Sequence, residues 1–95
     1  MRWTWDADKA KENRRRHGLS FETAILVFED ALHVSQPDPH PDGDRWQTIG
    51  VVASVPLFVV HTWPSAESTD REPIGRIVSA RKATARERRA YEEGF

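Results

Sequence analysis

The chain of 95 residues contains no cysteine, one tyrosine and one methionine. Without cysteine, a disulfide framework and a thiolate metal site are both excluded. The lack of disulfides agrees with a reducing compartment, so we expect a cytoplasmic protein. Apolar runs are also short, and none approaches the roughly 20 residues that a membrane-spanning helix requires. We therefore expect no membrane partner.

Several catalytic motifs are missing as well. The sequence has no nucleophile-elbow serine, no phosphate-binding glycine loop and no paired-histidine zinc motif. We therefore expect neither a metal nor a cofactor. The side chains that remain for chemistry are those of arginine, lysine, histidine and tyrosine, a set that suits metal-free reactions of a phosphodiester.

The sequence does contain enough apolar material for one small core. Hydrophobic residues make up 38% of the chain, and four tryptophans and four phenylalanines supply much of the area that can be buried. A chain of this length forms one domain and buries about two-thirds of its unfolded surface. We therefore predict a single domain over residues 1–95.

The charge is distributed unevenly, although the net charge is only −1. Residues 1–19 contain six basic and three acidic side chains, and residues 75–95 contain the same numbers. Residues 20–74 contain two basic and nine acidic side chains. If the basic ends meet in the fold, they form a positive surface that attracts phosphate groups. The alternative is that these charged side chains lie on solvated helix faces and bind no ligand.

Residues 75–95 contain the clearest local signals. A short strand is predicted at Gly75–Ala80, and a helix at Ala85–Glu92. Thr84 and Glu87 have the spacing of a capping box, in which each side chain accepts a hydrogen bond from the other residue's backbone N–H. The segment also contains five arginines, whose planar guanidinium groups bind phosphate in forked geometry: Arg76, Arg81, Arg86, Arg88 and Arg89. This pattern indicates a nucleic-acid ligand.

Upstream of this segment, periodicity and turn residues predict two helices and three strands. The first helix is Ala7–Arg16, with Asp6 as its N-cap. The second is Phe21–Glu29, with Ser20 as its N-cap. Gly18 separates the two helices, at a position where glycine adopts a left-handed backbone easily. The predicted strands are Ala31–Ser35, Arg45–Ala53 and Leu57–Trp63, with loops at Gln36–Asp44 and Pro64–Pro73 and a turn at Ser54–Pro56.

The order of these elements defines a fold class. Short connections between successive strands favour antiparallel pairing. We therefore predict an α+β fold with two N-terminal helices, a four-stranded antiparallel sheet and a C-terminal helix. The helices are expected to pack on one face of the sheet, giving two layers.

Two histidines are candidates for proton transfer, because histidine titrates near neutral pH. His17 ends the first helix, where it either acts as a general base or caps the helix as a cation near the negative end of the dipole. His61 lies in an apolar strand, where a packed structural role is the alternative. Either histidine suits proton transfer in the attack of a ribose 2′-OH on the adjacent phosphorus. Arginines placed nearby would stabilise the negative charge that develops on the phosphate oxygens. This reaction restricts the substrate to RNA.

Three stretches of the chain form an ordered pattern. The first is Trp5-Asp6-x-x-Lys9-x-x-x-Asn13-x-x-x-His17-Gly18-x-x-Phe21-x-x-Ala24. The second is Arg45-x-x-x-Ile49-Gly50. The third is Arg76-Ile-Val-Ser-Ala-Arg81-Lys82-Ala83-Thr84-x-x-Glu87-Arg88-x-x-Tyr91. Together they span nearly the whole chain, and they resemble the sequence pattern of the BrnT toxins.

This resemblance implies a RelE-like ribonuclease toxin of a type II toxin–antitoxin system, which cleaves RNA without a metal and inhibits translation and growth. The implied partner is a BrnA-like antitoxin, a ribbon-helix-helix protein, in a heterotetramer of two toxins and two antitoxins. Operator DNA would be bound only through the antitoxin. An alternative function is a non-enzymatic interaction module that acts with the antitoxin as a co-repressor.

The resemblance also implies the residues of the site. The expected catalytic residues are His17, His61, Arg76 and Arg81. The residues expected to bind RNA are Lys9, Arg45, Lys82 and Tyr91, and Glu87 also belongs to the pattern. Within this set, we expect the two arginines at the ends of the last strand to matter most, together with a histidine from elsewhere in the chain.

Overall fold

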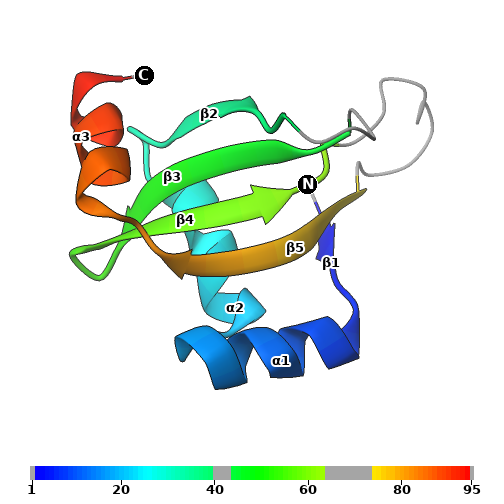
Figure 1. Cartoon of the computed structure of the whole chain (residues 1–95). Helices are drawn as coiled ribbons and strands as arrows, with labels where there is room; N and C mark the ends of the chain where they lie inside the picture. The colour runs from blue at the N-terminus through cyan, green and yellow to red at the C-terminus, as the bar shows by residue number, and fades with distance from the viewer. Residues whose placement is uncertain (1, 40–43, 64–73, 95) are drawn as a thin grey trace.

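The computed structural model describes residues 2–39, 44–63 and 74–94. Within these ranges it shows an α+β fold with a five-stranded, mostly antiparallel sheet in the order β1-β5-β4-β3-β2 (Figure 1). The elements are β1 (Arg2–Thr4), α1 (Ala7–His17), α2 (Phe21–Ala24), the 3-10 helix η1 (Ile25–Glu29), β2 (Val34–Pro37), β3 (Trp46–Val52), β4 (Val55–His61), β5 (Ile74–Lys82) and α3 (Ala85–Glu93). The predicted fold class is confirmed.

The prediction of four strands is wrong by one. The additional strand is β1, which pairs in parallel with the start of β5, with Trp3 opposite Gly75. Three residues are too few to show a strand period, so β1 could not be predicted from periodicity. A Cβ atom on residue 75 would lie 2.4 Å from the Trp3 ring, which explains why glycine stands there.

The predicted turn at Ser54–Pro56 is also misplaced. The β3–β4 hairpin turns at Ala53 and Ser54, whose φ angles are 49° and 69°, and Val55 already pairs with Val52. A two-residue hairpin turn with positive φ at both central residues matches the right-handed twist of the strands. Ala-Ser lacks the asparagine or glycine that normally marks such a turn. The predicted turn therefore began one residue too far toward the C-terminus.

The helix caps follow the predictions closely. Asp6 accepts hydrogen bonds from the backbone N–H groups of Asp8 and Lys9, and Gly18 ends α1 with a φ of 67°. The capping box of Thr84 and Glu87 is present at the start of α3. The predicted helix Phe21–Glu29 begins at its Ser20 cap, but it continues as 3-10 helix after one α-helical turn.

Other boundaries differ modestly from the predictions. The first predicted strand, Ala31–Ser35, is shifted toward the C-terminus and is observed as β2. The predicted loop Pro64–Pro73 lies outside the described residues, as does part of the predicted loop Gln36–Asp44.

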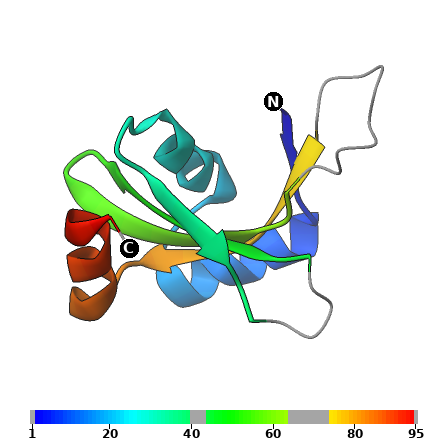
Figure 2. The same ribbon diagram turned by 90° about the horizontal axis from the view of Figure 1, so that it is seen from above.

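The helices do not form the single layer that the sequence predicted. Figure 2 shows α2 and α3 on opposite sides of the sheet, while α1 runs alongside β5 (Figure 1). On the side of α2, the core is formed by Phe21, Ala24, Val27, Leu57, Val59, Ile77 and Ala80. Gly50 of β3 packs against this side, where a Cβ atom would lie 2.7 Å from the backbone oxygen of Val27. The close approach of η1 to β3 therefore requires glycine at this position.

One polar side chain joins α1 to the sheet. Asn13 is 6% exposed, and its amide nitrogen donates to the carbonyl of Ala80 at 2.8 Å. Its amide oxygen accepts from the backbone N–H of Ala80 at 3.1 Å. The Asn13 side chain thus pairs with β5 as a neighbouring strand would. It does so at Ala80, past the residues of β5 that pair with the short β1. Both backbone groups of this edge residue are satisfied.

Candidate RNA-binding and catalytic groove

A shallow groove lies between α1 and β5, with a cavity of about 170 Å³. Its exposed residues include Lys9, Arg16 and His17. Residues at positions i, i+7 and i+8 lie on one face of a helix, which explains why α1 presents these three together. Among the described residues, the lining is Lys9, Glu12, Asn13, Arg16, His17, Val78 and Ser79. We call this site the α1–β5 groove.

The charge of the α1–β5 groove is predominantly positive. Glu12 is the single acidic side chain among the described lining residues, and it forms an ion pair with Arg15 at 2.6 Å. The hydrogen bond from Arg15 lowers the pKa of Glu12. The ammonium of Lys9 and the guanidinium of Arg16 remain as the cations of the lining. An anionic ligand such as a phosphodiester fits this charge.

A bulge in β5 shapes the opposite wall. Val60 of β4 pairs with Ser79, but His61 pairs with Ile77, so Val78 is an additional residue in β5. A bulge bends the strand and changes the direction of nearby side chains, and bulges are frequent beside active sites. Val78 and Ser79 consequently line the groove, with the Ser79 hydroxyl available as a hydrogen-bond partner. Periodicity alone did not indicate Ser79, because the bulge interrupts it.

Arg81, a predicted catalytic residue, is already engaged. Its two terminal nitrogens donate to the two carboxylate oxygens of Glu87 at 2.7 and 2.8 Å. The guanidinium also lies 4.3 Å from the ring centroid of Phe58. The hydrogen bond to Glu87 raises the pKa of Arg81. Arg81 thus links the end of β5 to α3.

Glu87 has two tasks at this junction. One of its oxygens accepts the backbone N–H of Thr84, and both oxygens accept from Arg81. Burial alone would raise the pKa of Glu87, but the hydrogen bonds from Arg81 and Thr84 outweigh burial and lower it. The capping box and the Arg81 pair therefore form one polar cluster.

Tyr91, predicted to bind RNA, attaches α3 to the rest of the domain. Its hydroxyl donates to the carboxylate of Asp30 at 2.6 Å. The same carboxylate accepts from the backbone N–H groups of Val51 and Leu32. The bond from Tyr91, followed by the two backbone bonds, lowers the pKa of Asp30. Asp30 therefore connects η1, β3 and α3.

His61 is fully buried, with no exposed surface. Its Nδ1 lies 3.0 Å from the carbonyl oxygen of Thr62, which can only accept, so Nδ1 carries the proton. Its Nε2, 2.6 Å from the Thr48 hydroxyl, then accepts in the neutral ring. Thr48 in turn lies 2.7 Å from Ser35 and accepts from it. This chain fixes the tautomer and uses both ring nitrogens, which argues against a role in contacting RNA.

The buried imidazole makes the stability sensitive to acid. Burial lowers the pKa of His61 to about 4, and the hydrogen bond to Thr62 opposes this only in part. The unfolded chain therefore binds more protons than the folded one between pH 6.5 and 4, and stability falls as the pH falls through this range. We expect the free energy of unfolding to decrease by about 2–3 kcal/mol from pH 7.5 to pH 4.5.

Urea unfolding at the two pH values measures this loss. Asp30 and Glu87, whose pKa values are lowered, lose their contribution as the pH falls through and below the ordinary carboxyl range. Most of their contribution therefore remains at pH 4.5, where the loss from His61 dominates. In the His61→Gln variant the acid-dependent decrease should largely vanish. An equal decrease in that variant would show that another group is responsible.

The remaining predicted residues lie outside the α1–β5 groove. Arg76 is exposed on β5; its carbonyl accepts from the backbone N–H of Thr62, and its own N–H donates to the Thr62 hydroxyl oxygen. Lys82 is exposed at the end of β5. Arg45 is half-buried just before β3, where its carbonyl accepts from the N–H of Asp38. Of the predicted residues, the groove brings together only Lys9 and His17, and it adds Arg16, Asn13 and Ser79.

Other classes of site receive no support from the described residues. Among residues 2–39, 44–63 and 74–94, no group of three or more His, Cys, Asp or Glu side chains could hold a metal ion. None of the helices described there has the length and apolar character needed to cross a membrane.

The small α+β domain presents a cationic groove that contains a histidine, and this charge is compatible with a phosphodiester ligand. The family model for the ribonuclease toxin BrnT of type II toxin–antitoxin systems matches residues 5–87. The chain therefore belongs to the BrnT family, and it is a ribonuclease toxin, an endoribonuclease, whose type implies a cognate antitoxin. This membership favours the enzyme over the non-enzymatic module. A search of curated proteins found no match.

Proposed function

We propose that the α1–β5 groove is the site of RNA cleavage and that the reaction needs no metal ion. The observation that supports this is the convergence of Lys9, Arg16 and His17 on one face of α1, opposite the β5 bulge. The three side chains supply two cations and a proton acceptor within a single cavity. These are the groups that transesterification of RNA requires from a protein.

In this reaction the ribose 2′-oxygen attacks the adjacent phosphorus. His17 accepts the proton of the 2′-OH as the new P–O bond forms. Lys9 and Arg16 stabilise the negative charge that develops on the non-bridging oxygens, and the Ser79 hydroxyl donates a further hydrogen bond. The bond from phosphorus to the 5′-oxygen then breaks, and the protonated His17 returns its proton to that oxygen. The products are a 2′,3′-cyclic phosphate and a free 5′-OH.

The other predicted residues receive different roles. We assign Arg76, Lys82 and Arg45 to contacts with the RNA backbone outside the groove, because two of them are exposed and none lines it. Arg81 and Tyr91 position α3 through their hydrogen bonds to Glu87 and Asp30. Buried His61 stabilises the sheet.

The partner is proposed to be a BrnA-like ribbon-helix-helix antitoxin in a complex of two toxins and two antitoxins. The uneven charge of the chain supports a partner that is distinct from RNA, since residues 20–74 are strongly acidic. Operator DNA is bound through the antitoxin in this scheme, and both toxin and antitoxin act in the cytoplasm.

Cleavage of a defined RNA by the purified toxin, in the presence of EDTA, tests the proposed reaction. We expect cleavage in EDTA, and no cleavage where a 2′-deoxynucleotide replaces the nucleotide at the cut. Lys9→Gln should lower kcat/KM by roughly tenfold or more, because a charge-assisted hydrogen bond contributes about 1.5–3 kcal/mol. Lys11→Gln is the matched control, since Lys11 is an exposed lysine of α1 outside the groove. Dependence on a divalent ion, or cleavage of the deoxy substrate, would overturn the mechanism.

A further inference from the structure

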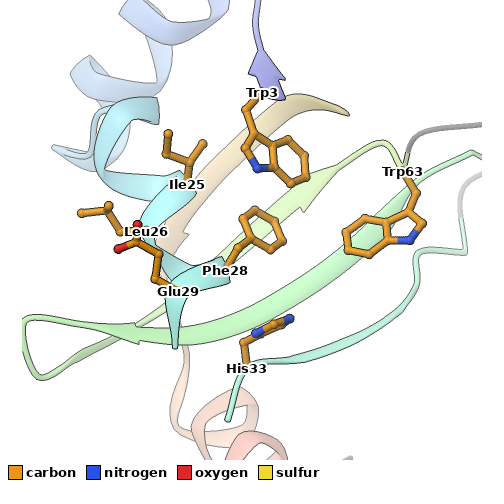
Figure 3. Close-up of a pocket in the computed structure, with 7 residues that line it drawn as sticks. All are labelled: Trp3, Ile25, Leu26, Phe28, Glu29, His33 and Trp63. Carbon is orange, nitrogen blue, oxygen red and sulfur yellow. The ribbon is translucent and has the colours of Figure 1, made fainter. Parts of the chain in front are cut away.

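A second groove runs along η1, away from the α1–β5 groove. It consists of two adjoining cavities of about 430 and 470 Å³, which share Leu26 and Glu29. The first is also lined by Trp3, Ile25, Phe28, His33 and Trp63 (Figure 3). The second is also lined by Asp30, Val51, Val52, Ala53 and Tyr91. We call the combined feature the η1 groove.

The walls of the first cavity are aromatic and mutually supported. The rings of Trp3 and Phe28 are stacked, with centroids 4.3 Å apart and an angle of 13° between their planes. His61 packs edge-on against both rings from within the core. The ring centroid of Trp63 lies 6.2 Å from that of Phe28, and Trp63 is 38% exposed. A cavity with such fixed walls can receive one or two large apolar side chains with little loss of side-chain freedom.

The charged carboxylates of the η1 groove give it an acidic character. Among the described residues, its lining contains the carboxylates of Glu29 and Asp30, the imidazole of His33, and no lysine or arginine. The carboxylate of Asp30 is already bonded to Tyr91, Val51 and Leu32, so exposed Glu29 is the charge offered to a ligand. Phosphate groups are repelled from such a surface, whereas a lysine or arginine beside apolar side chains is attracted. This charge is opposite to that of the α1–β5 groove.

We propose that the η1 groove is the docking site for the antitoxin. The bound segment would place apolar side chains against Leu26 and the Trp3–Phe28 wall, and a basic side chain against Glu29. The proposal rests on the antitoxin partner given under the proposed function, and a type II toxin implies such a protein partner. Exposed Leu26, 39% accessible, lies where the two cavities meet and is the central anchor point. Docking there engages a surface separate from the residues assigned to RNA cleavage.

The experiment compares variants of the toxin that are co-purified with the cognate antitoxin. Leu26→Asp and Glu29→Lys should each raise the Kd for the antitoxin more than tenfold and abolish protection of cells that express both proteins. Cleavage of RNA by the free toxin should stay within twofold of the parent, because neither residue lines the α1–β5 groove. Leu32→Asp is the matched control: Leu32 is 72% exposed and lines neither cavity of the η1 groove, so its Kd should equal that of the parent.

The outcomes separate the docking site from the identity of the partner. If Leu26→Asp and Glu29→Lys bind the antitoxin as tightly as the parent, the η1 groove is not the docking site, and the proposed partner stands. If the parent toxin does not bind a BrnA-like antitoxin, the proposed partner and the docking site both fail. A toxin that dimerises alone, and becomes monomeric through Leu26→Asp, would make the groove a contact between toxin copies and overturn the proposal. The mass of the parent complex reports whether the assembly contains two copies of each protein.

Discussion

Asn13→Ala is expected to lower the free energy of unfolding by about 4 kcal/mol, because leaving a buried backbone group without its partner costs about 1–3 kcal/mol. The amide of Asn13 bonds to both the N–H and the carbonyl of Ala80, and its nitrogen also donates to the carbonyl of Leu19 at 3.0 Å. Alanine removes all three hydrogen bonds. Small domains are stable by about 5–15 kcal/mol in total, so this loss is a large share of the whole.

Urea-induced unfolding monitored by circular dichroism measures the effect. Lys11→Ala is the matched control, since Lys11 lies on the same helix but is exposed, and it should change the stability by less than about 0.5 kcal/mol. A decrease below 1 kcal/mol in Asn13→Ala would show that water replaces the amide at the edge of β5. In that case the attachment of α1 would depend on its apolar neighbours.

His17→Gln is expected to reduce the rate of RNA cleavage by about 10²–10⁴-fold, the range in which a general base contributes. The folded state should be unaffected, because His17 is exposed at the last residue of α1. For His61→Gln we expect the opposite combination, a lower stability with little change in the rate of RNA cleavage. It disturbs a buried chain of hydrogen bonds and lowers stability, while any residual folded protein should still cleave RNA.

Single-turnover cleavage and thermal melting, measured on both variants, separate these two profiles. If His17→Gln cleaves RNA at the parental rate, the proton acceptor is not His17. If His61→Gln melts like the parent but does not cleave RNA, the buried histidine takes part in the chemistry. Either result would require a new assignment of the site.

Local signals in the sequence predicted the helix ends well. Asp6, Gly18 and the Thr84–Glu87 pair each act through contacts within a few residues, and these contacts are encoded by spacing alone. The helical repeat also places Lys9 and His17 on one face of α1, although the two residues were predicted only as separate members of the site.

Features that depend on distant partners could not be predicted in the same way. The β1 strand exists through its pairing with β5, and the β5 bulge exists through its register with β4. The capping role of Glu87 is local, but its bond to Arg81 depends on the path of the chain between β5 and α3. The direction of His61 toward the core depends on Thr48 and Ser35, which belong to two other strands.

The attachment of α1 has a consequence for how activity responds to temperature. Asn13 is the only buried residue of α1, a helix that is described in full and carries Lys9, Arg16 and His17. A helix held mainly by an amide, with little apolar burial, can separate from the sheet before the remaining core unfolds. Cleavage would then cease at a lower temperature than the loss of secondary structure, and amide hydrogens of α1 would exchange sooner than those of β3 and β4. The toxin would thus have a heat-labile active site on a more durable scaffold.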